Sequence, residues 1–157
     1  MGFFDFIFGG KDKPTASAAT AGKTQVDFDA ATAKLILAEI DIDSAISAHQ
    51  NWKVRLSNVL NGTSTETLKP EVVCLDDRCD LGKWLHGAGT QRMGHMPAFT
   101  MLIARHKQFH LEASTVLATA QGGNMQAATT MLNGAYNHTS QQVVTLLQHL
   151  KQALHKL

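Results

Sequence analysis

The chain has 157 residues, 44% of them hydrophobic, and its 14 Lys and Arg nearly balance 13 Asp and Glu to give a formal net charge of +1. This size and balance fit one globular domain, and they exclude the strong positive field of a nucleic-acid-binding protein and the self-repulsion of an acidic disordered chain. No apolar run approaches the ~20 residues that span a bilayer, and two cysteines are too few for a disulfide framework. The chain has an unusual number of histidines, eight, and this matters because histidine is the commonest metal ligand.

Residues 1–25 are predicted to form a flexible segment with a phenylalanine-rich tip. The tip reads MGFFDFIFGG, and the following stretch is mostly Gly, Ala, Ser, Thr and Lys, as in a linker. A secretory signal requires a basic residue before its apolar stretch, and none is present here. We therefore expect a cytoplasmic protein. The tip either packs back onto the body or docks into a partner's groove. A membrane surface is the less favoured partner, because the tip carries one acidic residue and no basic residue before Lys11.

Residues 26–157 are predicted to form a helical domain. Apolar residues recur at steps of three and four over residues 28–60, over the segment from Pro97 to the Gly122-Gly123 pair, and over residues 125–157. The third segment places Ala135 and His138 near its apolar seam. No clean period-two alternation appears, so no sheet is expected.

The turn-rich insert of residues 62–96 contains the stretch CDLGKWLHG at residues 79–87, which is predicted to form a short helix ending at Gly87. The expected fold is therefore all-α, an antiparallel bundle of about four long helices with a short helix that carries the cysteine.

Three histidines fall on the apolar seams of the predicted helices. His49 lies seven residues after Ile42 and seven before Leu56, and His106 and His110 are four residues apart on one face of a later helix. A single buried histidine is usually a hydrogen-bonded core residue, but two imidazoles at this spacing can reach one metal ion. Three such histidines and one cysteine would complete the four-coordinate site that zinc favours.

Two cysteines compete for the fourth position. Cys79 directly precedes the predicted short helix, whose N-terminus would lower the pKa of its thiol. Cys74 lies five residues earlier and is expected to be a small apolar residue, although it could also resolve an oxidised Cys79. His86 and His95 are reserve ligands, His138 is a candidate for the core or for contact with a ligand, and the remaining histidines are expected to be solvated.

The stretch Cys79-Asp80-Leu81-Gly82-Lys83-Trp84-Leu85 resembles the C-x-[LF]-G-x-W-[LY] signature of the chemoreceptor zinc-binding (CZB) domain family. His49 with Trp52 three residues later, and His106 with His110, are similar to that family's other markers and occur in the same order. The resemblance covers roughly residues 26–157.

The resemblance implies a helical bundle with one zinc ion held by His49, Cys79, His106 and His110. It further implies a sensory domain, often homodimeric, that responds to zinc or to oxidation of the zinc-bound cysteine and regulates a chemoreceptor or a diguanylate cyclase. No chemoreceptor or cyclase domain is evident in these 157 residues, so we expect the output to pass through a separate signalling partner or through a rearrangement of the dimer.

Other functions remain open at this point. A structural or buffering zinc would use the same ligands. A small zinc hydrolase would need an open coordination position and a general base, but no Glu follows His106 as it does in HExxH metalloproteases, and Glu112 is expected to point elsewhere. A haem or di-iron protein is less consistent with three imidazoles, one thiolate and no carboxylate. No catalysis is therefore expected.

Overall fold

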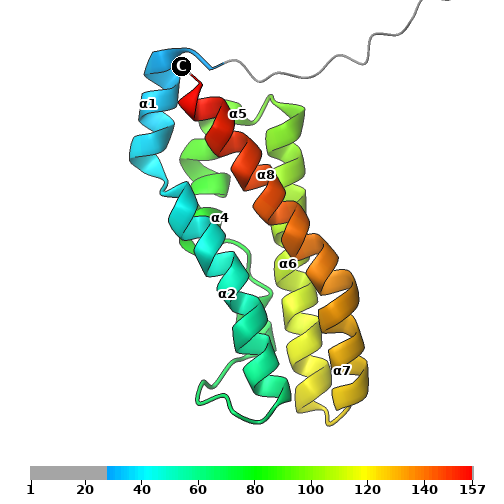
Figure 1. Ribbon diagram of the computed structural model, residues 1–157. Coiled ribbons are helices and arrows are strands. Elements are labelled where there is room, and N and C mark those ends of the chain that lie inside the picture. Colours follow the sequence, from blue (N-terminus) through cyan, green and yellow to red (C-terminus); the bar gives the residue numbers. More distant parts are fainter. Residues whose placement is uncertain (1–27, 157) are drawn as a thin grey trace, which may run out of the picture.

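The computed structural model describes residues 28–156, and these residues contain helices and no strand, which confirms the all-α prediction (Figure 1). The predicted segment of residues 1–25, with its phenylalanine-rich tip, lies outside the described residues. The longer helices are α1 (Ala30–Glu39), α2 (Ile42–Leu60), α6 (Pro97–Gln121), α7 (Met125–Met131) and α8 (Asn137–His155). Between α2 and α6 lie the short helices α3 (Pro70–Val73), α4 (Asp80–Trp84) and α5 (Thr90–Met93), and the chain kinks at Gly87 between the last two.

The first predicted helix is in fact two helices. Ile40 adopts an extended conformation after α1, and the side chain of Asp41 then accepts a hydrogen bond from the Ser44 amide at 3.0 Å. An aspartate in this position satisfies one of the free N–H groups of a helix start. The apolar pattern of residues 28–60 does not reveal this break, because Ile40 before Asp41 and Ile42 after it are both buried.

The long helices do not all alternate in direction, as an antiparallel bundle would require. Figure 1 shows α2 and α6 running the same way, with α8 antiparallel to both. The reason is the insert between α2 and α6, which leads the chain back along the length of the bundle before α6 begins. Residues of α3, α4 and α5 therefore lie beside the long helices instead of forming a simple loop at one end.

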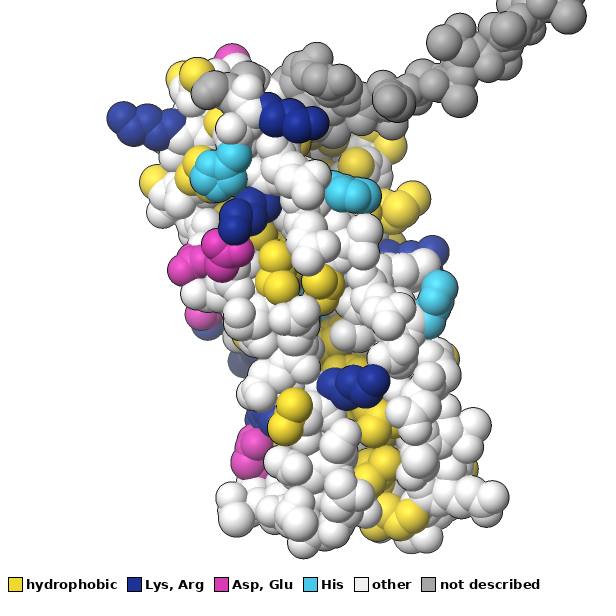
Figure 2. All heavy atoms as spheres, in the orientation of Figure 1, with side chains coloured by type: hydrophobic (Ala, Val, Ile, Leu, Met, Phe, Trp, Pro, Cys, Tyr) yellow, Lys and Arg dark blue, Asp and Glu magenta, His cyan; other side chains and the backbone are white. Residues whose placement is uncertain are grey.

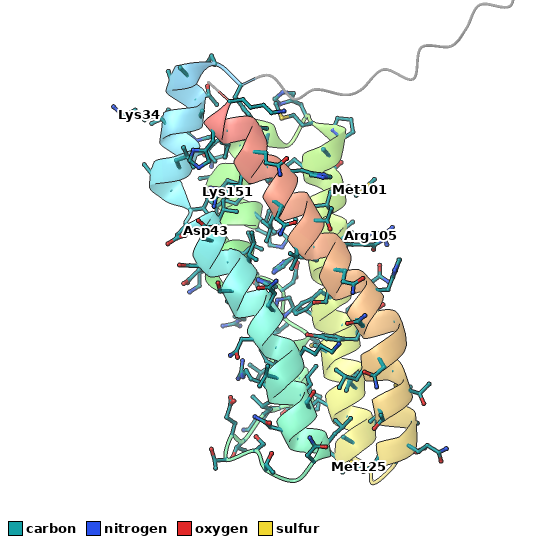
Figure 3. The ribbon with its side chains drawn as sticks, viewed as in Figure 1. Lys34, Asp43, Met101, Arg105, Met125 and Lys151 are labelled. Carbon is teal, nitrogen blue, oxygen red and sulfur yellow. The ribbon has the colours of Figure 1, made fainter. Side chains whose placement is uncertain are left out.

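Apolar side chains fill the space between the long helices, and Figure 2 shows a band of them exposed along the seam between α2 and α8. At one end of this seam Lys151 of α8 forms an ion pair with Asp43 of α2, with Nζ 2.6 Å from Oδ1 (Figure 3). Farther along, Lys53 Nζ donates to Asn137 Oδ1 at 2.8 Å. In the described part of the chain, no helix combines the length and the apolar character that crossing a bilayer demands.

A kink at Gly134, whose backbone is non-helical (φ −98°, ψ −106°), joins α7 to α8 and changes which residues face the core. Ala135 and His138, which the α-helical repeat placed near the seam, are exposed, whereas Tyr136 and Thr139 are buried. A kink of this kind changes which face of the following helix is turned to the core, which a regular repeat of apolar residues does not anticipate. The buried Tyr136 ring packs against Phe109, with 5.3 Å between centroids.

Gly82 allows the loop before α4 to pack directly onto that helix. A Cβ atom at this position would lie 1.7 Å from the carbonyl oxygen of Asp76, a backbone atom that cannot move independently. The backbone N–H of Gly82 also donates to Sγ of Cys79 at 3.3 Å, so Cys79 caps α4. The glycine in this motif thus places both Cys79 and the Asp76 loop.

Replacing Gly82 by alanine should therefore destabilise the protein by about 2 kcal/mol or more, because the added methyl group overlaps a backbone carbonyl. Gly122→Ala is the matched control: the nearest atom to its Cβ is 3.3 Å away and its backbone is already in the right-handed helical region. The control should change the free energy of unfolding in urea by less than about 1 kcal/mol. Equal effects of the two substitutions would contradict this packing.

Candidate metal centre

All four residues predicted as metal ligands converge in the structure. His49 comes from α2, His106 and His110 come from successive turns of α6, and Cys79 is the N-cap of α4. One potential ligand atom from each lies within 4.8 Å of the others. The histidines are 2%, 0% and 4% exposed, and Cys79 is half-buried, so the cluster lies inside the bundle.

The spacing of these atoms suits a tetrahedral metal ion. Nε2 of His106 lies 3.1 Å from Nε2 of His49 and 3.3 Å from Sγ of Cys79. Sγ lies 3.7 Å from Nε2 of His110. Ligand atoms around tetrahedral zinc, with Zn–N bonds of about 2.0 Å and a Zn–S bond of about 2.3 Å, are about 3.3–3.6 Å apart. The four side chains therefore fit a closed four-coordinate site with little rearrangement.

Backbone carbonyls orient two of the three imidazole rings. Nδ1 of His49 donates to the Ala45 carbonyl at 2.7 Å, and Nδ1 of His110 donates to the Val73 carbonyl at 2.8 Å. A carbonyl can only accept, so both rings carry their proton on Nδ1 and keep a lone pair on Nε2. Both lone pairs therefore belong to the nitrogens that point into the cluster.

Burial keeps the three imidazoles neutral. Removal from water lowers the pKa of His49 and His110, and it lowers the pKa of His106 to about 2, helped by the neighbouring histidines. Neutral imidazole is the form that binds a metal. At neutral pH the histidines of this site thus need to lose no proton before they act as ligands.

The pKa of the Cys79 thiol is not lowered, contrary to the expectation for a thiol at a helix N-terminus. Burial raises the pKa of the thiol, and this outweighs the hydrogen bonds from the Gly82 and Leu81 amides that favour the thiolate. The helix start does position the sulfur, but α4 has only five residues and its dipole is small. Without metal, Cys79 is a protonated thiol at neutral pH.

The other cysteine and histidines lie outside the cluster. Cys74 is a free, partly buried thiol that donates to the Glu71 carbonyl at 3.4 Å. His138 is exposed and forms a hydrogen bond with Gln142 instead of joining the core. The remaining four histidines are also exposed: His86, His95, His149 and His155.

Sequence reasoning missed Asp76, which lies beside the site. Its Oδ2 is 4.0 Å from Nδ1 of His106, the ring nitrogen that has no hydrogen-bond partner among the described residues. The same oxygen lies 2.8 Å from Nε2 of His86, which holds the carboxylate in place. Histidine ligands usually donate their second N–H to such a carboxylate. Nothing in the CLDDRC stretch distinguishes Asp76 from Asp77, because the loop conformation alone decides which one faces His106.

Asp76→Asn should therefore lower the metal affinity of the site about tenfold or more, because His106 would lose the charged acceptor nearest its Nδ1. Asp77→Asn removes a charge from the neighbouring, exposed position and serves as the control. Competition with a chromophoric chelator measures both affinities. If the two substitutions weaken binding equally, Asp76 has no specific role.

Comparison with known proteins agrees with this site. Residues 49–117 match the family model described as "Chemoreceptor zinc-binding domain". The matched segment begins at His49 and includes Cys79, His106 and His110. No curated protein and no solved structure was found to match the chain. This match is consistent with membership of the chemoreceptor zinc-binding family, as the motif around Cys79 indicated.

Proposed function

We propose that the protein is a cytoplasmic regulatory protein that binds one zinc ion through His49, Cys79, His106 and His110 and senses zinc or an oxidant at this site. The observation that carries the proposal is the convergence of three imidazole nitrogens and one sulfur within 4.8 Å, inside a segment that matches a zinc-binding domain.

The donor set favours zinc over other common metals. Three imidazoles and one thiolate form a mixed nitrogen and sulfur site, which suits zinc, whereas magnesium and calcium prefer oxygen ligands. The cluster contains no carboxylate, which argues against a di-iron centre of the helical-bundle type. Four protein ligands also fill the tetrahedral positions, so the arrangement favours binding over hydrolysis.

The ligands come from separate parts of the chain, which gives the site a means to influence the fold. His49 belongs to α2 and the histidine pair to α6, and Cys79 is the first capping residue of α4. Zinc, when bound, would hold the Cys79 sulfur as a thiolate. The sulfur also accepts a hydrogen bond from the Gly82 amide, so a change in the chemical state of the sulfur would alter the capping of α4.

The proposed output is a change in binding to a separate signalling partner, such as a chemoreceptor or a diguanylate cyclase, by a homodimer of this chain. Support comes from the description of the matching family, which names chemoreceptors. A purely structural or buffering zinc would use the same four ligands but would leave the affinity for such a partner unchanged.

Zinc binding at pH 7 should release about one proton per site. The pKa of each ligand histidine is lowered below 6.5, so these rings are already neutral, while the pKa of Cys79 is raised above 9.0, so the thiol must lose its proton. Calorimetric titration in buffers of different ionisation enthalpy counts these protons. Below the thiol pKa, affinity should fall about tenfold for each unit by which the pH decreases.

Cys79→Ser is the control for this count, since serine keeps a side chain that can cap α4. The variant should bind zinc more weakly and release almost no proton. Release of two or more protons by the unmodified protein would show that histidines are protonated in the metal-free site, and no release would exclude the thiol as a ligand.

Sensing requires that the partner distinguish the two states. We expect zinc-loaded and zinc-free protein to differ at least about fivefold in affinity for the cytoplasmic part of a chemoreceptor or for a diguanylate cyclase, the lower end of common allosteric coupling. Cys79→Ser should bind that partner with an affinity that responds little to zinc. Equal affinities with and without zinc would leave a structural or buffering role.

A further inference from the structure

A cavity of about 460 Å³ opens beside the metal centre and reaches two of its proposed ligands. Cys79 and His110 line it, and so do the apolar side chains of Trp52 and Val72. Its other wall belongs to the segment after α2, including Lys69, which precedes α3. A cavity of this size accommodates a small organic molecule. It thus provides a route from solvent to the site on the side of the thiol.

The lining of this cavity carries positive charge. Arg55, Lys69 and Arg78 contribute to it, and neither aspartate nor glutamate does. Arg55 stacks on Trp52 at 3.9 Å and is neutralised by Glu66.

The other two cations are less constrained. Arg78 has a side chain that is 71% exposed and lies 3.6 Å from the exposed Asp77. Lys69 forms no ion pair among residues 28–156. A cleft lined by one sign of charge raises the local concentration of molecules of the opposite sign.

We propose that this cavity admits small anionic disulfides to Cys79 and selects them over neutral ones. The Cys79 thiol would lose its proton to solvent, and its sulfur would attack one sulfur of the disulfide, whose S–S bond breaks as a new S–S bond forms with Sγ. The other half leaves as a thiolate, so the oxidation of Cys79 is balanced by the reduction of that sulfur. Cys79 would then no longer be an anionic ligand.

This inference deepens the proposed function, because it assigns a class of reagent to the same thiol. Its test does not depend on zinc binding. The reactivity of Cys79 can be measured with and without metal, while elemental analysis reports zinc content separately. Loss of zinc binding and loss of anion selectivity are therefore distinguishable results.

The experiment uses the full chain with Cys74→Ser, which leaves Cys79 as its single cysteine. The rate of reaction is measured with dithiobis(nitrobenzoate), a disulfide with two carboxylates, and with the neutral dithiodipyridine. The ratio of the two rates is divided by the same ratio for mercaptoethanol, a neutral thiol in free solution, which removes the intrinsic difference between the reagents. We expect a normalised ratio of about ten or more at low salt, falling as salt screens the charges.

Three further variants test the source of the selectivity and the route to the thiol. Lys69→Glu combined with Arg78→Glu should bring the normalised ratio close to one or below. Lys34→Glu combined with Lys156→Glu makes the same change in net charge at exposed positions near the C-terminal end of the bundle and should leave the ratio unchanged (Figure 3 labels Lys34). Val72→Trp, at a position that is 52% exposed, should narrow the cavity and slow both reagents.

A normalised ratio near one in the Cys74→Ser protein would overturn the proposal. So would an equal loss of selectivity in both double variants, since a general field would then be responsible. Circular dichroism of each variant verifies that the helices remain, so that altered rates report on the cavity.

Discussion

The burial of three imidazole rings in one helical core is the constraint on which the rest of this structure depends. Unpaired polar groups in a core are costly, so each ring nitrogen requires a partner. Two of the Nδ1 atoms find backbone carbonyls, those of Ala45 and Val73. The three Nε2 atoms instead face one another and the Cys79 sulfur. Without a metal ion, neutral rings whose lone pairs converge satisfy only part of one another's hydrogen-bonding capacity. The arrangement is therefore the one expected of a core that holds a metal ion.

A few close contacts with the surrounding fold position the residues of this cluster. Gly82 lets the loop before α4 approach the helix, which brings Cys79 and Asp76 toward α6. The Val73 carbonyl at the end of α3 orients His110, so the short helices of the insert belong to the site as much as the long ones do. On the other side, the Phe109 ring lies between His49 and Tyr136, with centroid distances of 5.0 and 5.3 Å. Cluster and core are therefore one packed unit.

The ligand positions were predictable because regular helices translate spacing directly into geometry. Four residues separate His106 from His110 and place them on one face, and seven residues on either side relate His49 to buried positions of its helix. The features that sequence analysis missed arise where the backbone departs from a regular helix. The extended Ile40 divides the first helix, and the kink at Gly134 leaves His138 exposed.

Asp76 and the pKa of Cys79 illustrate a second limit. Asp76 and Asp77 are chemically identical neighbours, and only the folded loop directs one of them toward His106. The helix N-terminus at Cys79 was correctly predicted, but its effect on the thiol depends on burial, which a local motif does not specify. The order of ligands follows from sequence, whereas their electrostatic environment follows from packing.

X-ray absorption spectroscopy at the zinc edge, on protein loaded with one equivalent of zinc, tests the central claim most directly. Three nitrogen ligands at about 2.0–2.1 Å and one sulfur at about 2.3 Å are the predicted first coordination shell. A shell without sulfur, or one that includes additional oxygen ligands at five- or six-coordinate zinc, would contradict a closed site made by His49, Cys79, His106 and His110.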